Sequence, residues 1–309
     1  MGKKILVAVD DSLYSKYAVK YAARISSAAK NVTFTLFNVQ PYVPQIFIER
    51  AETDPEVKTE INALVRKNTE AAGRIVGKFK ELMVGEGVPE NRIETVTQSA
   101  QVGVAKDILN RGEQGLYDAV VLARRGLTPS RDFFIGTIAS KVVEHALEIP
   151  VWVVGEETAS MKIMLAVDGS ENSLRVVDHL IHMIGPNPDL RLTLFHVVPC
   201  LKHYYSVDFE KEHPDLEEIL QSEDKPRMEG FYEKALERLK TAGLKKSQIK
   251  IKTATRCYDI STAILGEART RQYGTVMVGR RGEREAFFTG RIAMRLVQKV
   301  SDQALWVIP

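Results

Sequence analysis

Two aspartates occupy matching places in the chain, each directly after an apolar run. Asp10 follows Ile5–Val9, and Asp168 follows the similar run Ile163–Val167. A carboxylate at the end of a strand can accept hydrogen bonds from a ribose, and it can equally cap the amides of the helix that follows. Both uses stay open from the residues alone.

Glycines later in the chain are spaced to hold a phosphate. Gly126 closes the segment Ala123–Gly126, which contains two arginines, and nine residues later Gly136 and Thr137 open a helical pattern. Glycine lets the backbone approach a phosphate closely, and the amides and dipole of a helix N-terminus attract the anion. An ordinary loop with solvated arginines would look the same, so this spacing needs support from other positions.

The end of the second apolar run offers a place for a nucleotide base. Val39 and Pro41 follow Thr35–Phe37, and backbone groups there could bind the edge of an adenine. Pro41 could equally do no more than end the strand.

An internal duplication repeats most of these positions. Three pairs of segments, in the same order in both copies, carry it: Ile5–Ser12 with Ile163–Ser170, Arg124–Gly126 with Arg280–Gly282, and Trp152 with Trp306. The spacing between partners falls only from 158 to 156 to 154 residues along the chain. We therefore interpret the chain as two tandem domains, 1–155 and 161–309, since this period is too long for a solenoid repeat.

Apolar runs alternate with helical patterns in each domain, which predicts an α/β fold. Strands are expected at 4–10, 32–39, 93–97, 118–123 and 150–154, and again at 162–168, 191–198, 248–253, 275–279 and 304–308. We expect a separate doubly wound parallel sheet in each domain, with helices on both faces. A long helix is expected at 56–86. The stretches 40–60 and 199–226 could form lids over the nucleotide edge, but we interpret them as mobile connectors. Ligands bind at the carboxyl ends of such strands, so the aspartate, the base position and the glycines should meet at one edge.

Together these residues resemble the universal stress protein family. The ATP-binding branch of that family carries Gly, two residues, Gly, nine residues, Gly and then Ser or Thr. The first copy has Gly126, Gly136 and Thr137 at the expected spacing, but Ala123 replaces the first glycine. This match covers the whole chain as two domains, and both copies depart from the ATP pattern.

The second copy departs from the pattern in a different way. Both of the first two glycines are present, Gly279 and Gly282, but only seven residues separate Gly282 from Gly290. Arg291 then stands in place of the hydroxyl residue. A cation at a helix start opposes the dipole, although arginines could also bind a phosphate directly. We expect ATP in the first domain, with Mg²⁺ as a companion of the nucleotide, and weaker or absent binding in the second.

The resemblance implies five parallel strands in the order 3-2-1-4-5 in each domain, with ATP at the carboxyl edge. It implies the following nucleotide-binding positions: Asp10, Val39, Ala123, Arg124, Gly126, Gly136 and Thr137 in the first domain, and Asp168, Val197, Gly279, Gly282 and Gly290 in the second.

The resemblance also implies a function. We expect a cytoplasmic protein that binds adenine nucleotide and has a regulatory or stress-resistance role, with at most slow ATP hydrolysis. The alternative is an interaction module of the same fold without nucleotide. The resemblance further implies that the two domains pair through their last strands, near 151–154 and 305–308, and it leaves a homodimer open.

Composition excludes several other classes of protein. Lys plus Arg is 43 and Asp plus Glu is 40, so the net charge of +3 offers no polybasic surface for nucleic acid. No uncharged stretch is apolar enough to predict a membrane span. Cys200 and Cys257 lack CxxC spacing, so we expect thiols rather than zinc ligands or a disulfide. Neither a Walker A loop nor a Gly-x-Ser-x-Gly elbow occurs, and no metal site is expected.

Overall fold

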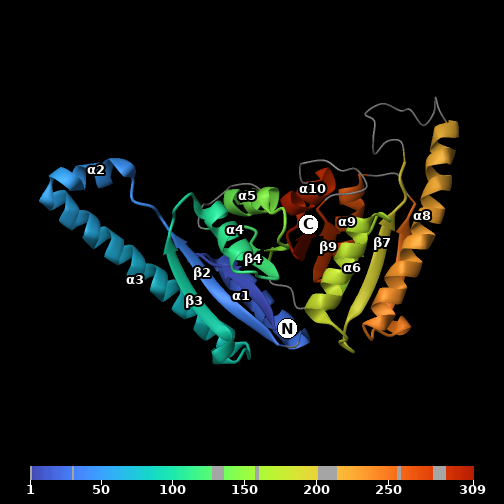
Figure 1. Ribbon diagram of the computed structural model, residues 1–309. Coiled ribbons are helices and arrows are strands. Elements are labelled where there is room, and N and C mark those ends of the chain that lie inside the picture. The colour runs from blue at the N-terminus through green and yellow to red at the C-terminus, as the bar shows by residue number, and fades with distance from the viewer. Residues whose placement is uncertain are drawn as a thin grey trace.

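The structure is a computed structural model that describes residues 2–29, 31–126, 136–156, 160–200, 214–255, 259–280 and 290–309 (Figure 1). The first half contains, in chain order, β1 (Lys3–Ala8), α1 (Leu13–Ala28), β2 (Val32–Gln40), α2 (Gln45–Thr53), α3 (Pro55–Gly85), β3 (Ile93–Ser99), α4 (Val104–Gln114), β4 (Ala119–Ala123), α5 (Thr137–His145) and β5 (Val151–Val154). The second half contains β6 (Lys162–Ala166), α6 (Glu171–Ile184), β7 (Arg191–Val197), α8 (Pro214–Thr241), β8 (Ile249–Ala254), α9 (Ile260–Thr270), β9 (Thr275–Gly279), α10 (Arg291–Lys299) and β10 (Ala304–Ile308).

Strand order confirms the predicted topology in each half. The sheet runs β3-β2-β1-β4-β5-β10-β9-β6-β7-β8, so each half has its own order 3-2-1-4-5 with parallel neighbours. The expectation of two separate sheets is wrong, because β5 and β10 pair in antiparallel fashion and join the halves into ten strands. This pairing satisfies backbone groups that two unpaired edge strands would otherwise expose.

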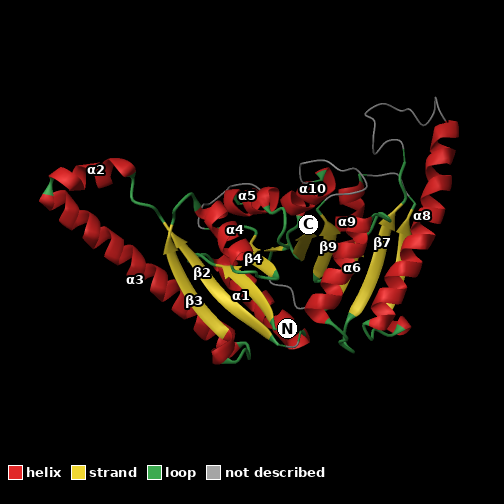
Figure 2. Cartoon of the chain, viewed as in Figure 1, coloured by secondary structure: helices red, strands yellow, loops and turns green. Residues whose placement is uncertain are grey.

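Helices cover both faces of the sheet, as Figure 2 shows. One hydrophobic core lies between the sheet and α1, α3, α6 and α8, and the other lies under α4, α5, α9 and α10. Ile5, Leu6 and Val7 are fully buried in turn, which is why β1 reads as a continuous apolar run rather than an alternating one. Both cores continue across the β5–β10 junction.

Two stacked indoles form the centre of that junction. Trp152 and Trp306 face each other in the β5–β10 register, with ring centroids 3.7 Å apart and planes 3° apart. The indole nitrogen of Trp306 donates to the Tyr21 hydroxyl at 2.8 Å, and that hydroxyl lies 2.7 Å from the Thr275 hydroxyl. The matching indole of Trp152 donates to Nε2 of His179 at 3.3 Å. Both tryptophans are therefore core and junction residues at once.

The two stretches interpreted as connectors contain helical residues. α2 lies wholly inside 40–60, and α8 begins at Pro214 and continues through Pro226. The connector interpretation is therefore wrong for these parts. Their many prolines and charged residues concealed two helices that extend beyond the sheet (Figure 1). No described helix is long and apolar enough to cross a membrane.

Candidate functional site

Serines fix the orientation of the Asp10 carboxylate. Its Oδ1 accepts hydrogen bonds from the Ser12 amide at 3.1 Å, the Ser12 hydroxyl at 2.5 Å and the Ser15 hydroxyl at 2.7 Å. Ser12, not Asp10, is the N-cap of α1, because its side chain accepts from the Ser15 amide. Asp10 thus holds the capping serine, and its other oxygen points toward the loop after β4.

Gly126 lies directly against that second oxygen. A Cβ built on Gly126 would stand 2.6 Å from Asp10 Oδ2, closer than any real side chain can approach. Because only glycine leaves room there, the loop after β4 reaches the carboxylate at the end of β1. This brings two of the predicted residues into one place.

Gly136 brings the start of α5 to the same place. Its amide donates to the Arg124 carbonyl at 2.8 Å, and an added Cβ would meet that carbonyl oxygen at 3.2 Å. Gly136 is the N-cap of α5, and the exposed Thr137 is the first residue of that helix. The helix N-terminus, with its free amides and favourable dipole, therefore lies beside Gly126 and Asp10.

Val39 completes the group of predicted residues that the fold gathers. β1 and β2 pair with Ala8 opposite Phe37, and this register places Val39 beside Asp10. The Val39 side chain is half-buried against the core under α4 and α5. Residues 127–135 of the loop lie outside the described residues. Asp10, Val39, Gly126 and Gly136 thus meet at the carboxyl edge.

The Arg124 side chain contacts the other half of the molecule. Its guanidinium donates to the Gln298 carbonyl at 2.6 Å, near the last turn of α10. Arg280 makes the matching contact from the second half, donating to the Glu144 carbonyl near the end of α5 at 2.6 Å. Burial, with Arg125 nearby, lowers the pKa of Arg124. A cation suits a helix C-terminus, so both arginines join the halves. A phosphate contact by Arg124 stays a prediction.

The second half repeats the aspartate but not the surroundings. Asp168 Oδ1 accepts from the Ser170 amide at 3.1 Å and from the Ser170 and Ser173 hydroxyls at 2.6 and 2.7 Å. The other predicted positions are placed as follows: Val197 ends β7, Gly279 ends β9, and Gly290 caps α10 and donates to the Arg280 carbonyl at 2.7 Å. Gly282 and the Arg291 side chain lie outside the described residues.

A buried polar cluster, absent from the sequence prediction, stands at this second edge. His196 Nδ1 donates to the Val167 carbonyl at 3.0 Å, and Nε2 lies 2.8 Å from Asp224 Oδ2. Arg227 donates to the other Asp224 oxygen at 2.6 Å. Asp224 and Arg227 belong to α8, and this helix also covers Gly169, where an added Cβ would meet Arg227 and Met228 atoms at 3.1 Å. One sequence signal for this cluster was available: His196 stands at the position of the second copy that matches Asn38 of the first, 158 residues earlier.

The first half is more open at the matching places. Asn38 donates to the Val9 carbonyl at 2.8 Å, as His196 does to Val167. Asp11, the counterpart of Gly169, is exposed and pairs with Lys78 of α3 at 2.9 Å. The connecting helix of the first half therefore meets this edge through a surface ion pair rather than a buried cluster.

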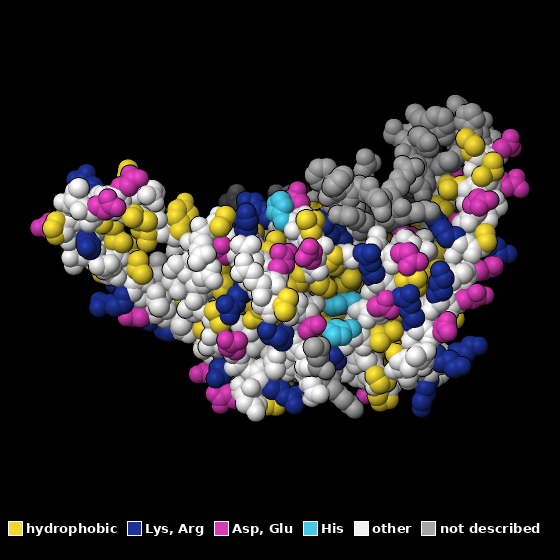
Figure 3. Space-filling model, viewed as in Figure 1, with side chains coloured by type: hydrophobic (Ala, Val, Ile, Leu, Met, Phe, Trp, Pro, Cys, Tyr) yellow, Lys and Arg dark blue, Asp and Glu magenta, His cyan; other side chains and the backbone are white. Residues whose placement is uncertain are grey.

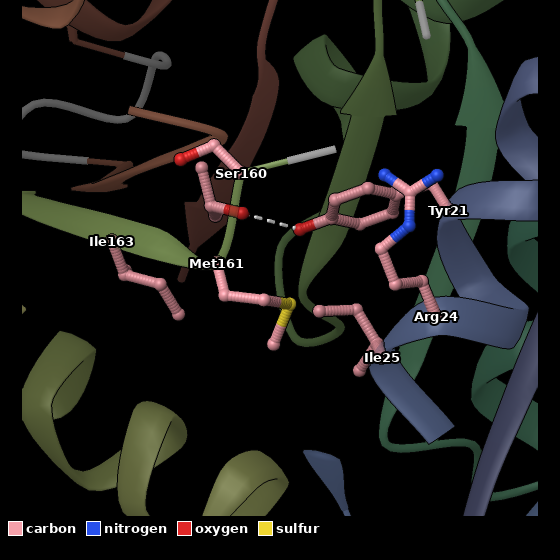
Figure 4. A pocket seen from close by; sticks show the side chains of 7 residues that line it. Tyr21, Arg24, Ile25, Ser160, Met161 and Ile163 are labelled. Carbon is pink, nitrogen blue, oxygen red and sulfur yellow. Dashed lines mark hydrogen bonds between the residues drawn. The ribbon is translucent and has the colours of Figure 1, made fainter. Parts of the chain in front are cut away.

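Other candidate features lie away from this edge. A small pocket next to Tyr21, Arg24, Ser160 and Met161 opens at the amino ends of β6 and β9 (Figure 4). Among the described residues, no group of three or more His, Cys, Asp or Glu could hold a metal ion. Cys200 is buried and disulfide-bonded, so the expectation of a thiol there is wrong. Cys257 lies outside the described residues.

Comparison with known proteins identifies the family to which this fold belongs. The model of the Universal stress protein family matches residues 1–155 and again 160–307. A universal stress protein from Archaeoglobus fulgidus DSM 4304 has a similar structure, with TM-score 0.60, 14% identity, and coverage of 99% of this chain and 97% of its own. A putative universal stress protein from Pseudomonas aeruginosa UCBPP-PA14 follows, with TM-score 0.56, 14% identity, and 99% and 92% coverage.

No curated protein matches the sequence. At such low identity the similar structures establish the fold alone, whereas the family match extends over nearly the whole chain, once in each half. The chain therefore belongs to the universal stress protein family and contains two tandem copies of its domain.

Proposed function

We propose that the first half binds an adenine nucleotide, ATP with Mg²⁺ in its working form, at the carboxyl edge of the sheet. The observation that carries this proposal is the close approach of Gly126 to Asp10, together with Gly136 at the start of α5. Gly126 leaves no room for a side chain and Gly136 leaves little, and two such glycines beside a helix N-terminus form a cradle for phosphate. The proposed role is regulatory or protective under stress, in the cytoplasm.

Each residue of the cradle has a distinct part in this proposal. Asp10 binds a ribose hydroxyl, because its Oδ1 is already held by Ser12 and Ser15 and its Oδ2 faces the loop. The phosphates contact the backbone of Gly126 and Gly136 and the Thr137 hydroxyl. The adenine lies near the end of β2 at Val39, next to Asp10 in the register of the sheet.

The second half is proposed to bind ATP more weakly or not at all. Its loop has seven residues between Gly282 and Gly290 where the first half has nine between its glycines, so fewer amides can surround a phosphate chain. In addition, α8 covers Gly169 next to Asp168. An interaction role without nucleotide, the alternative for this fold, therefore suits the second half better than the first.

Calorimetric titration of the full chain with ATP and Mg²⁺ tests both statements. We expect about one site per chain, and a loss of about tenfold or more in affinity for Asp10→Ala and Gly136→Val. The matched variants Asp168→Ala and Gly290→Val should bind like the unmodified protein. Thermal melting of each variant identifies any loss of folding.

Two results would contradict the proposal. Unchanged affinity in both Asp10→Ala and Gly136→Val would remove the site from the first half. A loss of affinity confined to the Asp168 and Gly290 variants would place the nucleotide in the second half instead.

A further inference from the structure

The apolar stripe of α3 continues past the end of the sheet. In the C-terminal part of the helix, Ala72, Val76, Phe79 and Met83 are buried. The same three-and-four spacing continues toward the N-terminus through Val57, Ile61 and Leu64. There the helix has left the sheet, and α2 packs beside it (Figure 1). We call residues 45–71, which comprise α2 and this part of α3, the arm.

Apolar side chains of the arm remain exposed although its two helices pack against each other. No residue of α2 is buried, and Ile46, Phe47 and Ile48 are 68%, 48% and 43% exposed. Leu64 of α3 is 44% exposed, and Figure 3 shows hydrophobic side chains gathered at this end of the molecule. A helix of nine residues is marginal in water without packing, and a contiguous exposed apolar patch marks an interaction surface.

Charges along the arm indicate what covers it. From residue 54 to 60 there are three acids, Asp54, Glu56 and Glu60, against one base. From 66 to 74, at the sheet end of the arm and just beyond it, there are three bases, Arg66, Lys67 and Arg74, against one acid. If two such helices lie antiparallel about a twofold axis, the acidic end of each faces the basic end of the other. The arm is therefore complementary in charge to a second copy of itself.

The matching helix of the second half lacks this complementarity. α8 also exposes apolar residues near its free end, Leu216 and Ile219. However, all five charged residues from 214 to 224 are acids. Two copies of this helix end would repel each other, so the charge pattern is specific to the arm of the first half.

We propose that the arm docks antiparallel onto the arm of a second copy of this chain. The two helix pairs form a four-helix bundle with Phe47 and Leu64 inside. The dimer contacts are made by α2 and the N-terminal part of α3, which contain none of the proposed nucleotide-binding residues.

Sedimentation velocity of the full chain over a wide range of concentration tests this dimer. The unmodified protein should shift from monomer toward dimer as concentration rises. Phe47→Glu and Leu64→Glu should each weaken the dimer by about tenfold or more, because an unpaired carboxylate is costly to bury. Ile219→Glu, an equally exposed position on α8, is the matched control and should dimerise normally. Because all three side chains are exposed, circular dichroism should report intact folding.

Charge exchange then identifies the partner as a second copy. Glu60→Arg should weaken dimerisation, and adding Lys67→Glu, which lies on the same flank of α3, should restore it, since both copies carry both changes. A chain that stays monomeric at every concentration would overturn the proposal. So would a dimer that Phe47→Glu and Leu64→Glu leave intact, or one that Ile219→Glu alone abolishes.

Discussion

Asn38 and His196 hold matching places in the two halves, and each donates a hydrogen bond to the carbonyl just before its aspartate. In the described part of the first half, no further side-chain hydrogen bond of Asn38 is observed. In the second half, His196 also binds Asp224 and through it Arg227, so that α8 is tied to the edge of the sheet. Strands and aspartates have been kept in both copies, whereas the helices that connect β2 to β3 and β7 to β8 have diverged. The difference suits an open edge in the first half and a closed one in the second.

The largest effect is expected from breaking the buried cluster of the second half. Asp224→Ala leaves His196 buried without its acceptor and removes the partner of Arg227. Removal of one partner from such a cluster costs about 3–5 kcal/mol, which should appear as a lower unfolding free energy in urea. Asn68 is the matched control, because it lies as far from the end of α3 as Asp224 lies from the end of α8. Asn68→Ala should lower the unfolding free energy by only about 0.5 kcal/mol or less.

A double variant separates the cluster from the helix. His196→Asn with Asp224→Asn gives these two positions the residues of the first half and replaces both buried members of the cluster together, while Arg227 remains with its side chain 30% exposed. Replacement of both buried members is far milder than loss of one of them, so stability should return to within about 1 kcal/mol of the unmodified protein. A double variant as unstable as Asp224→Ala would show that the two halves do not differ through this cluster.

A second contrast concerns the junction, where His179 of α6 stands where α1 has Tyr21. Burial, with His182 nearby, lowers the pKa of His179 to about 3, although Asp118 acts in the opposite direction. In the unfolded chain a histidine titrates near pH 6.5. Below that value the unfolded state takes up a proton that the folded state cannot, so stability falls as the pH drops from about 6.5 to about 3.

At pH 5 this loss amounts to about 2 kcal/mol, at 1.36 kcal/mol for each pH unit. His179→Gln keeps an acceptor for the Trp152 indole but cannot titrate, so its stability should depend less on pH over this range. Urea denaturation of both proteins at pH 7 and pH 5 gives the difference directly. Parallel pH profiles would mean that His179 already takes up its proton in the folded state.

Sequence predicts best the positions that depend on the backbone alone, namely the strands and the close approaches at glycines. Apolar runs and glycines determine strand positions and close approaches, and the predicted helix at 56–86 is observed as α3, Pro55–Gly85. The direction of a side chain could not be predicted. The sequence around Arg124 is the same whether its guanidinium faces a phosphate or, as observed, the end of α10. The His196–Asp224 contact joins residues 28 apart on different elements, and only the path of α8 brings them together.

The smallest effect is expected at Ala123, where the first half departs from the glycine of the second. Ala123 ends β4 in regular pairing with Val154, and Gly279 ends β9 in the same way opposite Ile308. Both positions are extended strand, so neither needs the conformational freedom of glycine. Ala123→Gly should therefore change ATP affinity by less than about twofold and cost about 0.5–1 kcal/mol of stability, the usual penalty for glycine inside a strand.

Ala119→Gly, at the other end of β4, is the matched control for that penalty, because it lies far from the cradle and pairs with Ile5. It should lose similar stability and bind ATP unchanged in calorimetry. A gain of about tenfold or more in ATP affinity for Ala123→Gly alone would mean that the methyl group obstructs the nucleotide. The first half would then be the impaired copy at this position, and the glycine that the second half retains at Gly279 would be the feature that matters for binding.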